Sequence, residues 1–159
     1  MCPATRDGGA TPVDRDRSVE AARALVRASR VLERSSDELS LAHYRVLSAI
    51  ASGDERASRV AERLELGKPT VSAAVDALCR AGLIARAEVE RDQRALALRV
   101  TTAGQIVLDR VENEMVARVD DLCSRTPDAV QMKEALAWLG AAIDVRAAER
   151  AAGRRGSGG

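Results

Sequence analysis

Apolar residues recur every three or four positions through most of the chain, which is the spacing of one face of an α-helix. The pattern predicts helices over 18–37 and 41–51, a short helix carrying Ala57 to Leu64, and another over 68–81. Two longer helices are predicted after residues 101 and 126. No repeat of 20–50 residues accompanies the pattern, so a solenoid is not expected.

Residues that favour helix ends mark most of these boundaries. Pro69 suits the first turn of the fourth helix, and Gly82 suits its end. Asp54 is the only plausible cap for the third helix, and Thr101 or Thr102 is expected to cap the fifth. The segment Thr126-Pro127-Asp128 predicts the start of the sixth helix, with Thr126 as its cap.

From Leu83 onward the period changes from 3.6 to 2, which is typical of a β-strand. Leu83, Ala85, Ala87 and Val89 alternate with the residues between them. A second alternating run carries Leu96, Leu98 and Val100, with Ala95, Ala97 and Arg99 between them. Two such runs around the charged turn Arg91-Asp92-Gln93-Arg94 predict a β-hairpin.

The first, fifth and sixth helices are too long and apolar for the small centre to cover. The fifth is expected to turn inward Ile106, Val107, Val111, Met115, Val119 and Leu122. The apolar stripe of the sixth is Met132, Leu136, Leu139, Ile143 and Ala147. We therefore expect a homodimer. Its interface would comprise Val19, Leu25, Val26, Val119, Leu136, Trp138, Leu139 and Ile143.

The predicted fold is mainly α with a small β-hairpin wing. A winged helix-turn-helix centre would occupy 38–103, and 18–37 with 104–150 would form the helical dimerisation region. Residues 1–17 are expected to be a disordered tail and 151–159 a flexible one, because both lack large apolar side chains.

Composition narrows the choice of chemistry. The net charge is +1, and residues 54–100 carry nine Lys and Arg against eight Asp and Glu. Nucleic-acid binding would therefore depend on where charges are placed and not on bulk charge. Tyr44 and Trp138 are the only aromatic residues, so the core must consist of aliphatic side chains.

The chain offers little for catalysis or metal binding. Its three cysteines lack CxxC spacing, and His43 is the single histidine, so no metal site and no cofactor is expected. No phosphate-binding loop, dinucleotide fingerprint or nucleophile elbow is present, which argues against an enzyme. With unpaired cysteines, no signal peptide and no membrane span in the sequence, we expect a cytoplasmic protein.

The fourth helix and the hairpin tip suit DNA. Lys68 can hold a phosphate, and the hydroxyls of Thr70 and Ser72 can contact base edges or phosphates. Asp76 would repel phosphate or accept from a cytosine amino group. A guanidinium on the narrow tip fits an A·T-rich minor groove. The plainer alternatives are an amphipathic surface helix and a solvated turn.

Asp92 at the tip should be repelled by DNA unless it has a structural task. We expect it to orient a nearby guanidinium, that of Arg94 or Arg86, through a charge-assisted hydrogen bond.

The hairpin region resembles the wing of the multiple antibiotic resistance regulator (MarR) family. The matching residues are Gly82, Leu83, Ile84, Arg86, Asp92, Arg94, Thr101 and Gly104, with Val100 where the family has leucine. Two further segments are similar to the family's recognition helix and second helix, namely LGKPTVSAAVDALCRAG and LAHYRVLSAI. The chain departs from the family pattern at Gly67, Ala73, Glu88 and Glu90, which implies weaker or differently targeted binding.

The resemblance implies a dimeric transcription regulator on a pseudo-palindromic operator. The helix from Lys68 would enter the major groove and Arg94 the minor groove. The candidate DNA-binding set is Lys68, Pro69, Thr70, Ser72, Ala73, Asp76, Arg80, Arg86, Arg91, Asp92 and Arg94. The family resemblance also implies a small-molecule pocket between the DNA-binding and dimerisation parts.

Candidate sensor residues are few. His43 and Tyr44 begin the second helix, near where pockets lie in the family, and are the candidate effector contacts; a structural histidine is the alternative. Cys79 and Cys123 fit buried small hydrophobes better than redox sensors. Trp138 is expected to anchor the dimer interface.

Two functions remain open besides catalysis, which the sequence disfavours. The first is a DNA-binding regulator, expected to act as a repressor. The second is a winged-helix protein-interaction module that does not bind DNA specifically, which the balanced charge and Ala73 motivate.

Overall fold

A computed structural model describes the backbone of residues 12–53, 56–89 and 92–156. Within these ranges, the side chains of residues 12, 88–89, 92–96, 151 and 154–156 lie outside the description. None of the helices in the described part is long and apolar enough to cross a membrane.

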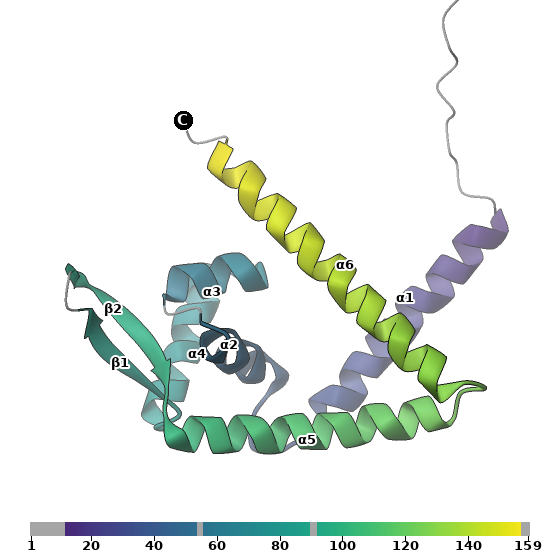
Figure 1. Cartoon of the computed structure of the whole chain (residues 1–159), viewed down its shortest axis with the longest axis horizontal. Helices are drawn as coiled ribbons and strands as arrows, with labels where there is room; N and C mark the ends of the chain where they lie inside the picture. Colours follow the sequence, from purple (N-terminus) through teal and green to yellow (C-terminus); the bar gives the residue numbers. More distant parts are fainter. Residues whose placement is uncertain (1–11, 54–55, 90–91, 157–159) are drawn as a thin grey trace, which may run out of the picture.

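Within the described ranges the fold consists of six helices and one antiparallel hairpin, as the sequence predicted (Figure 1). In chain order they are α1 (Pro12–Glu33), α2 (Leu41–Ala51), α3 (Ala57–Leu64), α4 (Lys68–Arg80), β1 (Ile84–Val89), β2 (Asp92–Val100), α5 (Thr102–Ser124) and α6 (Ala129–Gly156).

Helices α2, α3 and α4 pack together beside the hairpin, and the first half of α5 lies against them (Figure 1). The most deeply buried large side chains come from all four helices: Val46, Leu47, Val60, Val71, Leu78 and Val111. An aliphatic core of this kind fits a chain without phenylalanine. This core sets the orientation of α4 and the hairpin, the two elements expected to meet DNA.

The remaining helices extend away from this centre. The second half of α5 projects beyond it, and α6 runs back from the far end of α5 toward α3 (Figure 1). Helix α1 contacts α5. In the single chain, the apolar residues of α1 and α6 are largely exposed.

The predicted tails are wrong in part. Helix α1 begins at Pro12, so residues 12–17 are helical, and α6 continues to Gly156. Residues 1–11 and 157–159 lie outside the described residues. Low apolar content misled the prediction, because the added turns are rich in Arg and Ala or carry proline at the first helical position, where it is tolerated.

Two predicted caps are also wrong. Arg56 occupies the cap position of α3 and its side chain makes no capping hydrogen bond, while Asp54 lies outside the described residues. Asp128 caps α6, because its Oδ1 accepts from the backbone N–H of Gln131 at 2.9 Å. Thr126 instead donates its hydroxyl to the carbonyl of Cys123. Both Thr and Asp are good caps, and position relative to the first turn decides between them.

Burial along α5 differs from the prediction, and the hairpin buries one side of its alternating pattern. Val111 is fully buried, but Ile106 and Leu122 are 54% and 38% exposed, and Leu108 is buried in their place. In the hairpin, Ile84 pairs with Val100 and Arg86 with Leu98, so these four share one face. Ile84 and Leu98 are therefore buried, and Ala85 is exposed.

Candidate nucleic-acid interface

The recognition helix α4 follows a tight turn after α3. Glu65 ends α3 with φ of 52°, a left-handed conformation that is uncommon for a residue other than glycine. Gly67 occupies the cap position of α4 without a side-chain hydrogen bond, and Pro69 stands in the first turn, as predicted. This helix-turn-helix arrangement places the start of α4 at the surface.

One face of α4 is buried and the opposite face is exposed. Val71, Ala74, Val75 and Leu78 are at most 8% exposed and pack into the core. All the predicted DNA-contact residues of the helix are exposed: Lys68, Pro69, Thr70, Ser72, Ala73, Asp76 and Arg80. The outward face is short-chained and hydroxyl-bearing at its leading end, which allows close approach to a groove.

The hairpin projects beside α4 and has an irregular tip. Pairing is regular from Ile84–Val100 to Glu88–Leu96, and a register shift follows between Glu88 and Val89. Arg91 lies outside the described residues, and so do the side chains of Asp92 and Arg94. Their strand, β2, pairs with β1, which packs against α4, but the contacts predicted for the tip are not tested.

Arg86 of β1 pairs with Asp76 of α4. Its Nη2 lies 2.5 Å from Asp76 Oδ1, and both side chains are about half exposed. Arg86 was one of two guanidinium groups expected to pair with Asp92; its described partner is Asp76, and the side chain of Asp92 lies outside the description. The contact joins the wing to the recognition helix and offsets the negative charge that Asp76 would present to a phosphate.

Thr101 fixes the wing to the helices on both sides of it. Its hydroxyl donates to the carbonyl of Gly82 at 2.7 Å and accepts from the N–H of Gly104 at 3.0 Å. Its own N–H donates to the carbonyl of Leu83 at 3.0 Å. One residue thereby ties the end of the α4 turn, the second strand and the first turn of α5 together, confirming Thr101 as the cap.

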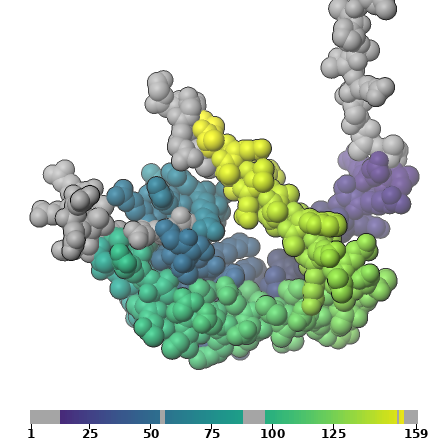
Figure 2. Space-filling model, viewed as in Figure 1, coloured from purple at the N-terminus to yellow at the C-terminus, as the bar shows by residue number. Residues whose placement is uncertain are grey.

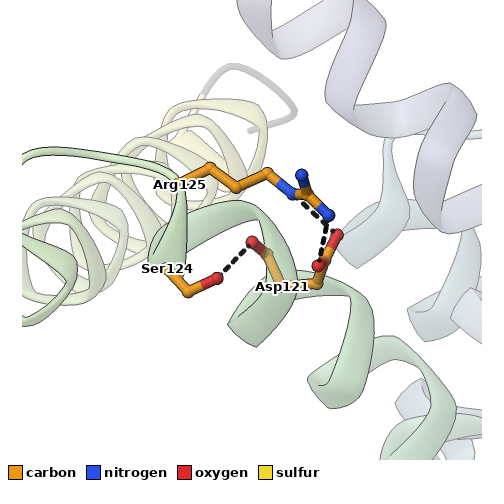
Figure 3. Close-up of polar contacts among 3 residues, drawn as sticks. All are labelled: Asp121, Ser124 and Arg125. Carbon is orange, nitrogen blue, oxygen red and sulfur yellow. Dashed lines mark hydrogen bonds and ion pairs between the residues drawn. The ribbon is translucent and has the colours of Figure 1, made fainter.

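Polar contacts at the end of α5 direct the chain into α6. Arg125 donates to both carboxylate oxygens of Asp121, at 2.8 and 3.2 Å, and Ser124 donates to the Asp121 carbonyl (Figure 3). The hydrogen bond from Arg125 lowers the pKa of Asp121. Lys133 of α6 lies 2.7 Å from Asp120, which raises the pKa of its ammonium. These contacts set where α6 begins.

The candidate effector residues lie at the contact between α2 and α5. His43 Nδ1 is 3.0 Å from the hydroxyl of Ser40, the cap of α2. Tyr44 donates to Glu112 Oε1 of α5 at 3.3 Å. Burial and the nearby Glu112 carboxylate raise the pKa of Tyr44. Both residues thus have local structural partners, and their role toward a ligand stays a prediction.

Two clefts lie elsewhere, alongside α6. One of about 700 Å³ lies between the α3–α4 turn and the end of α6, and one of about 410 Å³ lies between α2, α3 and α6. Arg150 and Glu65 line both. Sequence reasoning missed these clefts and the pairing of Arg86 with Asp76, because side chains distant in sequence form them and no local pattern marks them.

The predicted dimer face is exposed in the single chain. Exposed fractions are 40% for Val19, 48% for Leu25, 62% for Val26, 41% for Leu136, 67% for Trp138, 39% for Leu139 and 58% for Ile143. Val119 is partly buried. Cys123 is buried and Cys79 packs against the core at partial exposure, as expected of small apolar side chains.

A helix-turn-helix with an exposed second helix, followed directly by a two-stranded wing, defines a winged helix-turn-helix protein. Residues 38–95, the centre of that unit, match the model of the MarR family. This match confirms, over the winged-helix centre, the resemblance to the MarR family found in the sequence, and solved structures share the fold. Comparison with curated proteins gave no match.

Solved structures share the fold over most of the chain. CouR bound to a 23-mer DNA duplex is 21% identical with a TM-score of 0.69, covering 87% of this chain and 98% of CouR. CouR from Rhodococcus jostii RHA1 bound to p-coumaroyl-CoA is 21% identical with a TM-score of 0.64, covering 80% and 93%. BldR from Sulfolobus solfataricus is 19% identical with a TM-score of 0.64, covering 83% and 99%.

Proposed function

We propose that the protein acts in the cytoplasm as a homodimeric repressor on a pseudo-palindromic operator. The observation that carries the proposal is the arrangement of α4, whose apolar face is buried while its polar face stands exposed beside the hairpin. The structural similarity to CouR, which was solved on a DNA duplex, supports it. The regions 18–37 and 104–150 would dimerise and 38–103 would bind DNA.

Each exposed residue of α4 has a proposed role set by its position. Lys68, at the helix start, would bind a phosphate, and Thr70 and Ser72 would contact base edges. Pro69 and Ala73 would lie close to the groove wall, and Arg80 would reach the backbone. These contacts depend on placement, since the surrounding region is nearly charge-balanced.

The wing would add contacts in the minor groove. Arg94 would insert there, steadied by Asp92, while Arg91 would lie against the backbone. Arg86, held by Asp76, would position the strand that carries this tip.

Two copies would associate through the exposed apolar residues of α1 and α6. Many large apolar side chains exposed on two helices favour association with another protein surface. Symmetry then supplies two recognition helices, which match two half-sites one helical turn apart. A dimer bound at a promoter would repress by excluding the polymerase.

A small molecule would relieve repression, and the structure of CouR with p-coumaroyl-CoA supports this step by analogy. His43 and Tyr44 are proposed contacts for such a ligand, because the bond from Tyr44 to Glu112 joins the centre to α5.

Selection of bound fragments from the source genome tests the proposal. We expect two half-sites related by a dyad with centres about 10 base pairs apart or a multiple of that. Arg94→Ala should weaken binding to most sequences in fluorescence anisotropy, because a wing arginine senses groove shape and charge. Arg23→Ala, an equal charge change on exposed α1, is the control. Equal affinity of the two variants would remove the wing from the mechanism.

A protein-interaction module without specific DNA binding is the second candidate. The engagement of Arg86 by Asp76 and the small side chain of Ala73 favour it, because each leaves the surface of α4 and the wing with one fewer cation available for phosphate. It predicts no salt-dependent binding to any duplex, even at ~50 mM salt.

A further inference from the structure

A cleft of about 410 Å³ separates α6 from α2 and α3. Figure 2 shows α6 crossing the face of the molecule beside these helices. The lining residues are Arg45 of α2, Arg63 and Leu64 of α3, Glu65, and Ile143, Arg146, Ala147 and Arg150 of α6.

Positive charge dominates this lining. Four guanidinium groups face the cleft and Glu65 supplies its single carboxylate. Arg150 Nη1 lies 2.6 and 2.5 Å from the two Glu65 oxygens, so that carboxylate is already engaged. Arg45 and Arg146 form no ion pair within the described part of the chain. The lining therefore carries a net charge near +3, which a doubly charged anion would offset better than a single carboxylate.

The same cleft has an apolar component. Leu64 and Ala147 line the cleft together with the arginines, as does Ile143, which is also assigned to the dimer interface. The volume falls within the range that holds small organic ligands. A bare inorganic ion would leave these side chains in contact with water, whereas an ion carrying a short hydrocarbon body would cover them.

We propose that this cleft binds a soluble organic phosphate monoester with a short aliphatic body. Arg45 and Arg146 would hold the phosphate, because guanidinium forks match phosphate oxygens in geometry. Leu64 and Ala147 would contact the hydrocarbon. This inference rests on the proposed function for its biological role, since it names the chemical class of the effector and assigns it to this cleft, which His43 and Tyr44 do not line, but binding is measurable without DNA.

The ion pair between Arg150 and Glu65 connects the cleft to the recognition helix. Glu65 ends α3 in a left-handed conformation and is followed, after one residue, by Gly67 and Lys68 at the start of α4. A phosphate that attracts Arg150 would compete with Glu65 for it. The ligand would thereby change the contact between α6 and the turn that positions α4.

Isothermal titration calorimetry of the full chain with three probes tests the site. Hexyl phosphate should bind most tightly, inorganic phosphate more weakly, and hexanol not at all, because the site needs both charge and an apolar body. Equal binding of hexanol and hexyl phosphate, or no binding of hexyl phosphate, would overturn the proposal. Binding to vesicles containing phosphatidic acid without binding of hexyl phosphate would also overturn it, in favour of a lipid surface.

Variants locate the binding in the cleft. Arg146→Gln should weaken hexyl phosphate binding by about tenfold or more, the usual effect of losing a charge-assisted hydrogen bond. Arg59→Gln, the same change at an exposed residue of α3 outside the cleft lining, should leave it unchanged. Glu65→Gln should tighten binding, because Arg150 is released from its carboxylate. Equal effects of Arg146→Gln and Arg59→Gln would show general attraction to a basic surface and sink the assignment.

DNA anisotropy separates this inference from the proposed function. Arg146→Gln without ligand should bind operator DNA as the wild type does, because Arg146 lies on α6 and not on α4 or the wing. Failure of the wild type to bind any duplex refutes the proposed function and leaves the calorimetric result standing. Normal DNA binding with no hexyl phosphate binding refutes only the site.

Discussion

Asp76 of α4 and Arg86 of β1 form an ion pair of 2.5 Å across the candidate DNA-binding surface. Their side chains are 50% and 48% exposed, so the pair contributes at most about 1 kcal/mol to folding. The ion pair matters for the surface charge near α4 more than for the stability of the fold. It joins α4 to the wing and removes one phosphate-repelling and one phosphate-attracting charge together.

Replacing Asp76 with Asn should steepen the salt dependence of DNA binding. Arg86 would be released to contact a phosphate, which adds about one to the magnitude of the log–log slope. Anisotropy titrations over a series of salt concentrations measure this slope. Arg86→Gln should instead weaken binding, because it leaves the Asp76 carboxylate unpaired beside DNA. An unchanged slope in Asp76→Asn would show that Arg86 does not reach the backbone.

Gly104 is a packing requirement where α5 meets the wing. A Cβ at this position would lie 2.0 Å from the Leu83 carbonyl oxygen and 3.0 Å from Val100 Cγ1. Because the nearest atom is backbone, Gly104→Ala should lower the free energy of unfolding by about 3 kcal/mol or more, measured in urea.

Gly67→Ser is the matched control for that change. A Cβ there meets only Pro69 and Thr70 atoms at 3.7 and 3.8 Å, which is ordinary contact. The new hydroxyl can cap α4, whose first turn has no side-chain cap, and should raise stability by a few tenths of a kcal/mol. Comparable losses in both variants would contradict the close approach at Gly104.

Local patterns predicted the elements that form the candidate interface. The apolar spacing from Leu41 to Ala51 and the proline at position 69 gave α2 and α4 within a residue or so of their observed bounds. Thr101 was identifiable because a cap acts on neighbours within three residues. The class of fold follows from such short-range signals taken in order.

Other features depend on contacts that no local pattern carries. The partner of Arg86 is ten residues away in sequence, on a different element, and only folding brings the two together. Periodicity finds the face of α5 that is apolar, but not which part of it the centre covers. Leu108 is buried there, while Ile106 remains exposed. The start of α1 was placed too late, at 18 and not at Pro12, because charged helix formers resemble a solvated tail in composition; its end was also placed too late, at 37 and not at Glu33.

Trp138 offers a direct test of the dimer. It is the only tryptophan and is 67% exposed in the single chain. If α6 lies in the interface, its emission should shift to shorter wavelength as protein concentration rises through the dissociation constant. Leu139→Glu should abolish the shift by placing a charge in the interface, with dissociation visible in sedimentation.

A matched change tests whether that effect belongs to α6. Ile106→Glu introduces the same charge at an exposed apolar residue of α5 outside the predicted interface. It should leave the concentration dependence intact. Loss of the dimer in both variants, or in neither, would contradict an interface formed by α1 and α6.

Tyr44 should make stability depend on alkaline pH. Burial, and then the Glu112 carboxylate, raise the pKa of its phenol above 10.0. As pH rises, the unfolded chain therefore loses this proton first, and stability falls from the unfolded pKa upward until the folded phenol also ionises. Tyr44 is the only tyrosine, so ultraviolet absorbance reports its ionisation without overlap from others.

Two variants isolate this contribution from lysines that titrate in the same range. Glu112→Gln removes the negative charge beside the phenol and should lower the pKa of Tyr44, leaving it raised by burial alone. Tyr44→Phe should make the fall in unfolding free energy above pH 10 shallower than in the wild type, since the remaining groups are unchanged. If the phenol titrates at its ordinary value in the folded chain, or if Glu112→Gln leaves its titration unmoved, the contact between α2 and α5 is not the one that governs Tyr44.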